Sequence, residues 1–220
     1  MRFHETERDT KRLIVVGGGG HAKVVISILR KLKQYQVLGY TDLKDNGAVL
    51  GVPYLGSDQA LTACIKDQGK LGGFVLGVGQ VGLGRPRCEL WNRLQSFSLP
   101  FPPIVSPGAI VNEEARSGDG SVIMDGAVIS CGAALGRGVI VNTNSTIEHD
   151  TELGDWVHVA PGATVCGEVT IGAYSMIGAG ATVIEGKKIA PCCVVGAGAT
   201  VVHHLTEPGV YVGSPARRIG

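Results

Sequence analysis

The sequence predicts two consecutive domains, a small α/β domain followed by a coiled β-solenoid. Two observations carry this prediction. Apolar runs alternate with helical patterns before Pro100, and from Leu135 to Val201 every sixth residue is Leu, Ile or Val. A period of six fits neither the helical period of 3.6 nor the alternation of a half-buried strand. It is typical of solenoids in which six residues form one flat side and three sides close a triangular coil. Stacked coils would bury one continuous aliphatic column.

The N-terminal domain is expected to be a small parallel sheet with flanking helices, because predicted strands and helices alternate along the chain. Short apolar runs predict strands at 12–16, 36–40 and 73–79, and amphipathic or capped stretches predict helices at 22–32, 57–67 and 85–94.

A proline-rich junction, Leu99–Pro103, separates the two patterns. Because it cannot continue a helix, we place the domains at 1–101 and 102–220. The hexads begin raggedly after this junction. We expect the period to slip around 116–120 and once more before Leu135.

Charge and cysteine content narrow the function classes. The net charge is +1 over 220 residues, so the chain shows no global preference for nucleic acid or a membrane surface. We find no secretory or transmembrane-length apolar run in the sequence. The six cysteines form no C-x-x-C pair and no zinc spacing, which predicts reduced, mostly buried thiols in a cytoplasmic protein. We expect no nucleic-acid partner, no membrane partner and no metal.

A glycine-rich turn follows the first predicted strand. Gly17, Gly19 and Ala22 fit the pattern G-x-G-x-x-A, in a strand-turn-helix context where backbone N–H groups cradle phosphate. Asp42 ends the second strand, where an acidic residue commonly meets a ribose hydroxyl. Such turns also serve only to pack a helix on a strand, so both interpretations stay open. With three strands rather than a full dinucleotide fold, a nucleotide-linked substrate is favoured over NAD.

The second chemical signal is the run Glu148-His149-Asp150, which departs from the small-residue pattern of the other hexads. Ile147 is expected to point inward, so these side chains should lie at or near a corner and reach solvent or a neighbouring subunit. An imidazole titrates near neutral pH and can accept a proton from an attacking group. A neighbouring carboxylate can fix its tautomer. The run is a candidate general-base site, the alternative being a surface histidine on a turn.

Two further patterns stay ambiguous from the residues alone. His149 and His158 are nine positions apart, which is not a multiple of six, so a shared metal site is a weak alternative. Cations at Lys187-Lys188 and Arg217-Arg218 suit the phosphates of an acidic cofactor or, equally, a solvated cap on the solenoid. No cysteine or serine lies in a triad-like setting, so a covalent acyl-enzyme is not expected.

Together these residues resemble the hexapeptide acyltransferases. More narrowly, they resemble the branch that N-acetylates nucleotide-linked 4-amino-4,6-dideoxy sugars, including the bacillosamine-pathway and perosamine acetyltransferases. The segments that carry the resemblance are Gly17–Ala22, Tyr40–Asp42, Gly77–Gly79, Ile147–Asp150 and Gly213–Arg217. It implies an α/β N-terminal domain with a small Rossmann-like parallel sheet, followed by a left-handed parallel β-helix. It also implies a homotrimer with active sites between subunits.

The resemblance implies roles for individual residues. His149 matches the general base and Asp150 the carboxylate oriented on it, while Glu148 lies beside the substrate. The implied nucleotide-sugar pocket comprises Gly19, Gly20, His21, Thr41, Asp42 and Gly79. The implied acetyl-CoA site comprises Asn142, His158 and Gly167 at the thioester, and Ala179, Ala197, Pro215, Arg217 and Arg218 along the pantetheine and adenine. The backbone N–H of Gly167 is a candidate oxyanion donor.

The implied activity is transfer of an acetyl group from acetyl-CoA to the 4-amino group of a nucleotide-activated, UDP-linked 4-amino-4,6-dideoxy sugar. Two alternatives stay open. Gly79–Arg85 and Pro103–Pro107 equally resemble relatives described as sialic acid O-acetyltransferases, which would act on such a free sugar. The other alternative is a non-catalytic scaffold that binds a nucleotide sugar.

Overall fold

The structure is a computed structural model that describes residues 10–67 and 71–219. The first nine residues of the expected N-terminal domain therefore lie outside the described residues. The chain forms two compact units. The first runs up to Gly79 and takes in Leu99–Phe101, and the second comprises Gln80–Ser98 and the chain from Pro102 onward.

The first unit is built on a three-stranded parallel sheet in the order β2-β1-β3. β1 is Lys11–Val16, β2 is Tyr35–Thr41 and β3 is Gly73–Leu76. The central strand β1 is fully buried from Leu13 to Val16, as its run of β-branched and aliphatic residues predicts for a parallel sheet. The predicted small parallel sheet is confirmed.

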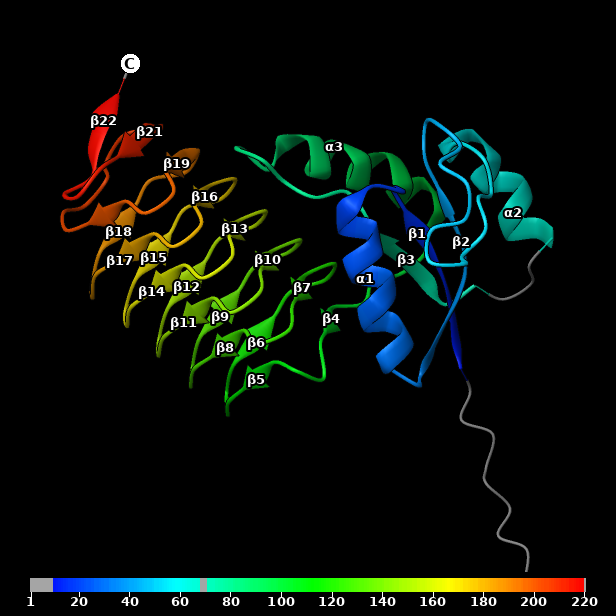
Figure 1. Ribbon diagram of the computed structural model, residues 1–220, viewed down its shortest axis with the longest axis horizontal. Helices are drawn as coiled ribbons and strands as arrows, with labels where there is room; N and C mark the ends of the chain where they lie inside the picture. The colour runs from blue at the N-terminus through cyan, green and yellow to red at the C-terminus, as the bar shows by residue number, and fades with distance from the viewer. Residues whose placement is uncertain (1–9, 68–70, 220) are drawn as a thin grey trace, which may run out of the picture. The chain divides into compact units, whose positions relative to one another are not determined.

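Helix α1 (Gly20–Lys31) follows β1 after the glycine-rich turn and packs against β1 and β2 (Figure 1). Its buried residues recur at helical spacing: Ala22, Val25, Ile26, Ile28 and Leu29. The helix predicted at 57–67 begins as a 3-10 turn, η1 (Asp58–Ala60), and continues as α2 (Leu61–Asp67).

The second unit is dominated by a β-helix (Figure 1). Each coil contributes one short strand to each of three faces, and strands of successive coils pair in parallel. The first face contains β4 (Ile104–Val105), β7 (Val122–Ile123), β10 (Ile140–Val141), β13 (His158–Val159), β16 (Met176–Ile177), β19 (Cys193–Val195), β21 (Gly209–Val212) and β22 (Arg217–Ile219). The second contains β5 (Ile110–Val111), β8 (Val128–Ile129), β11 (Thr146–Ile147), β14 (Thr164–Val165), β17 (Thr182–Val183) and β20 (Thr200–Val201). The third contains β6 (Arg116–Ser117), β9 (Ala134–Leu135), β12 (Glu152–Leu153), β15 (Thr170–Ile171) and β18 (Lys188–Ile189).

The turns between faces stack into three edges, which we name by one residue each. The Asn142 edge joins the first face to the second and contains residues 142–145 and their equivalents one coil away. The His149 edge joins the second face to the third and contains residues 148–151 and their equivalents. The Tyr174 edge joins the third face to the first and contains residues 172–175 and their equivalents.

From β7 to β18 the second residue of each strand points into the prism, which confirms the predicted aliphatic column. Every sixth residue from Leu135 to Val201 is at most 6% exposed. Small side chains such as Ala163, Ala181 and Ala199 are buried beside this column in the same core. Each buried Val, Leu or Ile contributes roughly 1.5–3 kcal/mol relative to an exposed position, so the repeat itself stabilises the unit.

The predicted slips of the period are wrong. Strands begin every six residues from β4 to β18, and β6 pairs in register with β9. The sequence hides this because Ser117 takes the inward position that an aliphatic residue holds elsewhere. Nor do the charges at Lys187 and Lys188 break the repeat, since Lys188 begins β18 directly opposite Thr170.

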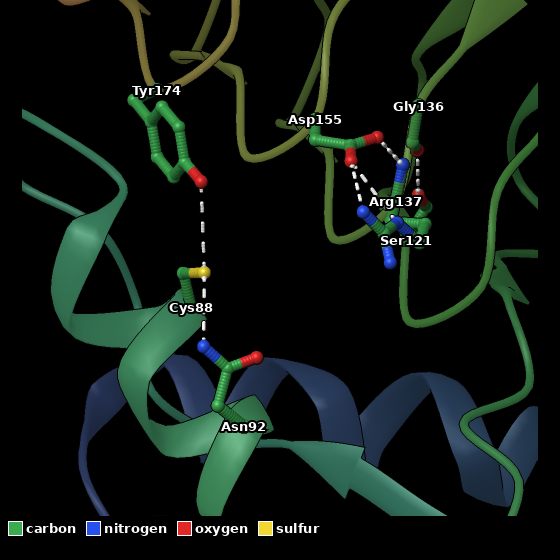
Figure 2. A network of polar contacts seen from close by, with 7 residues as sticks. All are labelled: Cys88, Asn92, Ser121, Gly136, Arg137, Asp155 and Tyr174. Carbon is green, nitrogen blue, oxygen red and sulfur yellow. Dashed lines mark hydrogen bonds and ion pairs between the residues drawn. The ribbon is translucent and has the colours of Figure 1, made fainter. Parts of the chain in front are cut away.

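The segment Gln80–Ser98, which we call the strap, packs on the solenoid. It contains α3 (Arg85–Leu94), as predicted, and η2 (Gln95–Phe97). Trp91 of α3 meets the Trp156 ring edge-on, with centroids 5.6 Å apart. Figure 2 shows the Cys88 thiol lying between the side chains of Asn92 and Tyr174, 3.8 Å from each partner atom. By its packing the strap belongs with the solenoid. The limits at 101 and 102 concern which parts of the chain fold as units, and they stay a prediction.

The solenoid ends in a hairpin on its first face, where β21 pairs parallel with β19 and β22 returns antiparallel to β21. Among the helices of the described residues, none has the length and apolar character needed to cross a membrane.

Candidate active site

The run predicted as a general-base site forms one polar pair at the His149 edge. The Nδ1 atom of His149 lies 3.0 Å from Oδ2 of Asp150. A carboxylate can only accept, so Nδ1 carries the proton and Nε2 is left as the basic nitrogen. The two side chains are 49% and 67% exposed, which leaves Nε2 open to a substrate.

Asp150 holds this pair at a backbone position that suits glycine. Its φ is +55°, and the equivalent turn residues one coil before and two coils after are Gly132 and Gly186. A side chain in this left-handed region is uncommon, although Asp tolerates it better than most residues. The carboxylate therefore occupies a turn that needs no side chain for the fold.

The imidazole of His149 lies over Gly167, one coil further along the same edge. A Cβ atom built on Gly167 would come within 2.6 Å of Nε2, so no other residue fits there without moving the ring. Within the part of the chain that the structure describes, the Gly167 N–H makes no hydrogen bond, whereas the next N–H donates to the His149 carbonyl at 2.9 Å. This N–H is available as the predicted oxyanion donor.

The hydrogen bond to Asp150 raises the pKa of His149 above its ordinary value, and the charges of Glu148 and Glu185 act in the same direction. Glu148 is half-buried at this edge. The site can thus hold a base that is stronger than a free imidazole.

His158 is placed differently, on the first face at the start of β13. It is only 6% exposed. Its Nδ1 lies 3.0 Å from the Gln80 carbonyl and its Nε2 lies 3.1 Å from Nδ2 of Asn142. Burial lowers the pKa of His158 to about 4, and the charge of Arg87 adds to the decrease. This histidine is neutral at physiological pH.

Asn142 lies on an edge whose later coils, at 160–163, 178–181 and 196–199, are made of small residues and Pro161. Equivalent turns one coil apart are bonded to each other: Gly162 N–H to Thr143, Gly180 N–H to Pro161 and Gly198 N–H to Ala179. Ala179 and Ala197 are exposed along this edge. The last strand of the second face adjoins the C-terminal hairpin, because Thr200 N–H donates to the Gly213 carbonyl at 3.0 Å.

Three of the predicted cofactor residues lie in that hairpin. Pro215 is exposed in the turn. Arg218 is paired with Glu207 at 2.9 Å, and Arg217 donates to the Ala216 carbonyl at 3.2 Å. Arg218 is therefore one half of an exposed ion pair.

The predicted site residues of the solenoid thus fall on two edges. His149, Asp150 and Gly167 share the His149 edge, whereas Asn142, Ala179 and Ala197 share the Asn142 edge. Within one chain, Gly167 is the expected cofactor residue that lies beside the base, whereas the others lie on the Asn142 edge, on the first face or in the hairpin.

The glycine-rich turn of the first unit divides into two parts. Gly17 has φ +111°, and a Cβ on Gly18 would overlap the Tyr40 ring. These two glycines serve packing. A Cβ on Gly19 or Gly20 would meet no atom within 4 Å, so these two positions have room for a ligand beside the first turn of α1.

A cavity of about 350 Å³ lies at this turn. Besides Gly18–Gly20 it is lined by Lys23, Asn46, Ala48 and Val49, which were not among the predicted site residues. Of these residues, Lys23 is the one that the sequence could have predicted, because it is a cation one turn after a glycine-rich helix start, where phosphates bind. The others come from the loop after β2, whose path sequence patterns do not reveal.

The other predicted pocket residues gather at the same end of the sheet. Oδ2 of Asp42 accepts the Gly18 N–H at 2.7 Å, so this carboxylate fixes the turn. The carbonyl of the buried Thr41 accepts the Gly17 N–H at 2.7 Å. A Cβ on Gly79 would lie 3.2 Å from that of His21. Carboxyl ends of parallel strands commonly form such ligand sites.

No cluster of three or more His, Cys, Asp or Glu side chains suited to a metal ion occurs among the described residues.

Comparison with known proteins relates both units to one group. Residues 12–83 match the family model of the PglD N-terminal domain. No curated protein matches the chain. Among solved structures, the acetyltransferase domain of PglB from Neisseria gonorrhoeae is 32% identical, with a TM-score of 0.88, and the match covers 96% of this chain and 100% of that one. It has also been solved in complex with acetyl coenzyme A.

A second similar structure is perosamine N-acetyltransferase from Caulobacter crescentus, in complex with CoA and GDP-perosamine. It is 34% identical, with a TM-score of 0.88, and the match covers 94% of this chain and 96% of that one. WeeI from Acinetobacter baumannii shares the fold at 22% identity, with a TM-score of 0.82. This chain belongs to the hexapeptide, left-handed β-helix acetyltransferases, in the amino-sugar N-acetyltransferase branch that carries a PglD-type N-terminal domain.

Proposed function

We propose that the protein transfers the acetyl group of acetyl-CoA to the 4-amino group of a nucleotide-linked 4-amino-4,6-dideoxy sugar, with a UDP sugar as the first substrate to test. The observation that carries this proposal is the His149–Asp150 pair, whose free Nε2 lies over Gly167. Family membership supports the cofactor and the class of acceptor.

In the proposed reaction the sugar amine attacks the thioester carbonyl carbon directly. Nε2 of His149 accepts the proton that the amine loses, and Nδ1–H stays bonded to Asp150. The N–H of Gly167 donates to the developing oxyanion. The C–S bond then breaks, the CoA thiolate leaves, and the proton held on Nε2 of His149 passes to the thiolate or to solvent, which restores the base.

The nucleotide half of the substrate is assigned to the first unit. The open positions Gly19 and Gly20 and the lining residue Lys23 give the cavity N–H donors and one cation, which suit a diphosphate. Asn46 also lines this cavity, and Asp42 is assigned to the ribose hydroxyls.

We also propose that the working form is a homotrimer with active sites between subunits. The separation of the site residues onto two edges supports this. If the His149 edge of one copy faces the Asn142 edge of the next, base and thioester meet, and Ala179, Ala197 and the hairpin follow the pantetheine toward the adenine.

A thiol-release assay tests the reaction. Purified protein is given acetyl-CoA with UDP-, GDP- or dTDP-linked 4-amino sugars, or with free sialic acid. We expect CoA release with one or more nucleotide-linked amino sugars and none with sialic acid. Release with sialic acid alone would establish the O-acetyltransferase instead. Nucleotide binding without any thiol release would indicate a scaffold.

A further inference from the structure

A chain of hydrogen bonds connects the strap to the Asn142 edge through the buried ring of His158. The Gln80 carbonyl can only accept, so Nδ1 of His158 must carry its proton, and Nε2 is a lone-pair acceptor. At the far end, Oδ1 of Asn142 accepts the Thr143 N–H at 2.8 Å. The amide nitrogen of Asn142 therefore faces Nε2 and donates to it. The contacts at Gln80 and at Asn142 therefore require the same direction of donation, from Asn142 to Nε2 and from Nδ1 to the Gln80 carbonyl.

The Gln80 carbonyl is held in place by the side chain of the same residue. Its amide nitrogen donates to the carbonyls of Gly82 at 3.0 Å and Trp156 at 3.2 Å. The strap is fixed again where the Gly84 N–H donates to the Tyr174 carbonyl at 3.2 Å. A Cβ on Gly84 would come within 2.5 Å of the Trp156 carbonyl, so only glycine permits this approach.

Arg87 of α3 acts on His158 through its charge. Its guanidinium is fully buried, lies 5.8 Å from the Trp156 ring centroid and donates to the Gly138 carbonyl. Within the described residues no carboxylate pairs with it. An unpaired buried charge is costly, and its field opposes a second proton on His158. Arg87 is the charged group that faces this ring.

We propose that Gln80 and Arg87 are positioning residues: Gln80 holds His158 as the Nδ1–H tautomer and the charge of Arg87 keeps the ring neutral, so that Asn142 presents its second amide N–H in one fixed direction. Within the described chain this second N–H has no partner. This step rests on the proposed function, in which the thioester lies on the Asn142 edge. The second amide N–H of Asn142 is then a donor for the thioester carbonyl. His158 then contributes no donor of its own toward that edge.

The tautomer is measured without any substrate, so its result is independent of the proposed function. Two-bond ¹H–¹⁵N spectra of histidine-labelled protein assign the protonated nitrogen of His158. We expect Nδ1–H in the wild type and in Val81→Ser, a strap variant at a position that is 97% exposed. In Gln80→Met, which cannot make the two anchoring bonds, the Nε2–H form should become populated. An Nε2–H form in the wild type overturns the proposal, and so does an unchanged tautomer in Gln80→Met.

Kinetics separate positioning from a merely structural role. His158→Ala should lower kcat roughly 10- to 100-fold, as the loss of a directed donor does, and should leave the KM for the nucleotide sugar unchanged. His158→Gln can accept from Asn142 and donate to the Gln80 carbonyl, so it should restore kcat to within several-fold of the wild type. Equal loss in a folded His158→Gln variant overturns the proposal. If the wild type acetylates no amino sugar, the proposed function fails while the tautomer result still stands.

Discussion

The two histidines at positions 149 and 158 lie half a coil apart in the same solenoid and have opposite environments. His149 stands at an edge, half exposed and bonded to a carboxylate, which raises its pKa. His158 stands on a face beneath the strap, bonded to a backbone carbonyl and facing Arg87, and its pKa is lowered to about 4. One residue type thus has a raised pKa at an edge, as the proposed base needs, and a lowered pKa on a face, where it is the proposed fixed acceptor.

The largest effect is expected at the edge. His149→Ala should lower kcat/KM roughly 10²- to 10⁴-fold because it removes the proposed general base, while the melting temperature should hardly change at an exposed position. His203→Ala removes another exposed histidine and serves as control. Thiol release within a few-fold of the wild type in His149→Ala would refute the assignment of the base.

His158, on the first face, should control how the free energy of unfolding depends on pH. His158 has a pKa of about 4 when folded against 6.5 when unfolded, so the unfolded chain takes up the proton first. Above pH 6.5 His158 is neutral in both states and its stabilising effect is fully present. As the pH falls from 6.5 to 4, the free energy of unfolding decreases by about 3 kcal/mol. Unfolding of the wild type and of His158→Gln should be compared between pH 7.5 and 4.5. Parallel decreases in the two proteins would contradict this account. His149 carries the opposite sign, since its raised pKa favours the folded state at low pH.

Asp150 offers a smaller effect that separates fold from chemistry. Asp150→Gly suits the backbone at φ +55°, so the fold should be at least as stable as the wild type. Activity should fall roughly 10-fold, because the ring loses its partner. In Asp150→Asn the pKa of His149 should decrease, which moves the acidic limb of the kcat/KM profile to lower pH. An unshifted limb would show that the carboxylate does not tune the base.

The smallest effect concerns the glycine-rich turn. Gly20→Ala meets no atom, so the fold should be intact while the KM for the nucleotide sugar rises several-fold if the phosphates approach the backbone there. Gly18→Ala should instead lower the melting temperature, because its Cβ would overlap Tyr40. An unchanged KM in Gly20→Ala would favour a role in packing alone.

Local patterns predicted the parts of this molecule that depend on neighbours in sequence. The six-residue period gave the inward column, and adjacency gave the His149–Asp150 pair. The period was missed at Ser117, where one polar residue takes an inward position in the early coils. The bond between His158 and Gln80 joins residues 78 positions apart, and the packing of Arg87 on Trp156 is equally remote in sequence. Neither leaves a periodic signal, so neither could be read before the fold was known.

The central claim is that the two edges act together across two copies of the chain. Co-expression of His149→Ala and Asn142→Ala chains with different tags yields mixed assemblies, whose composition is verified by native mass spectrometry. Each parent alone should be nearly inactive. In a random trimer mixture, three quarters of the assemblies contain both chains and each has one intact site of three, so about a quarter of wild-type activity should return. Mixed trimers that stay as inactive as their parents, or a fully active wild-type monomer, would contradict the account.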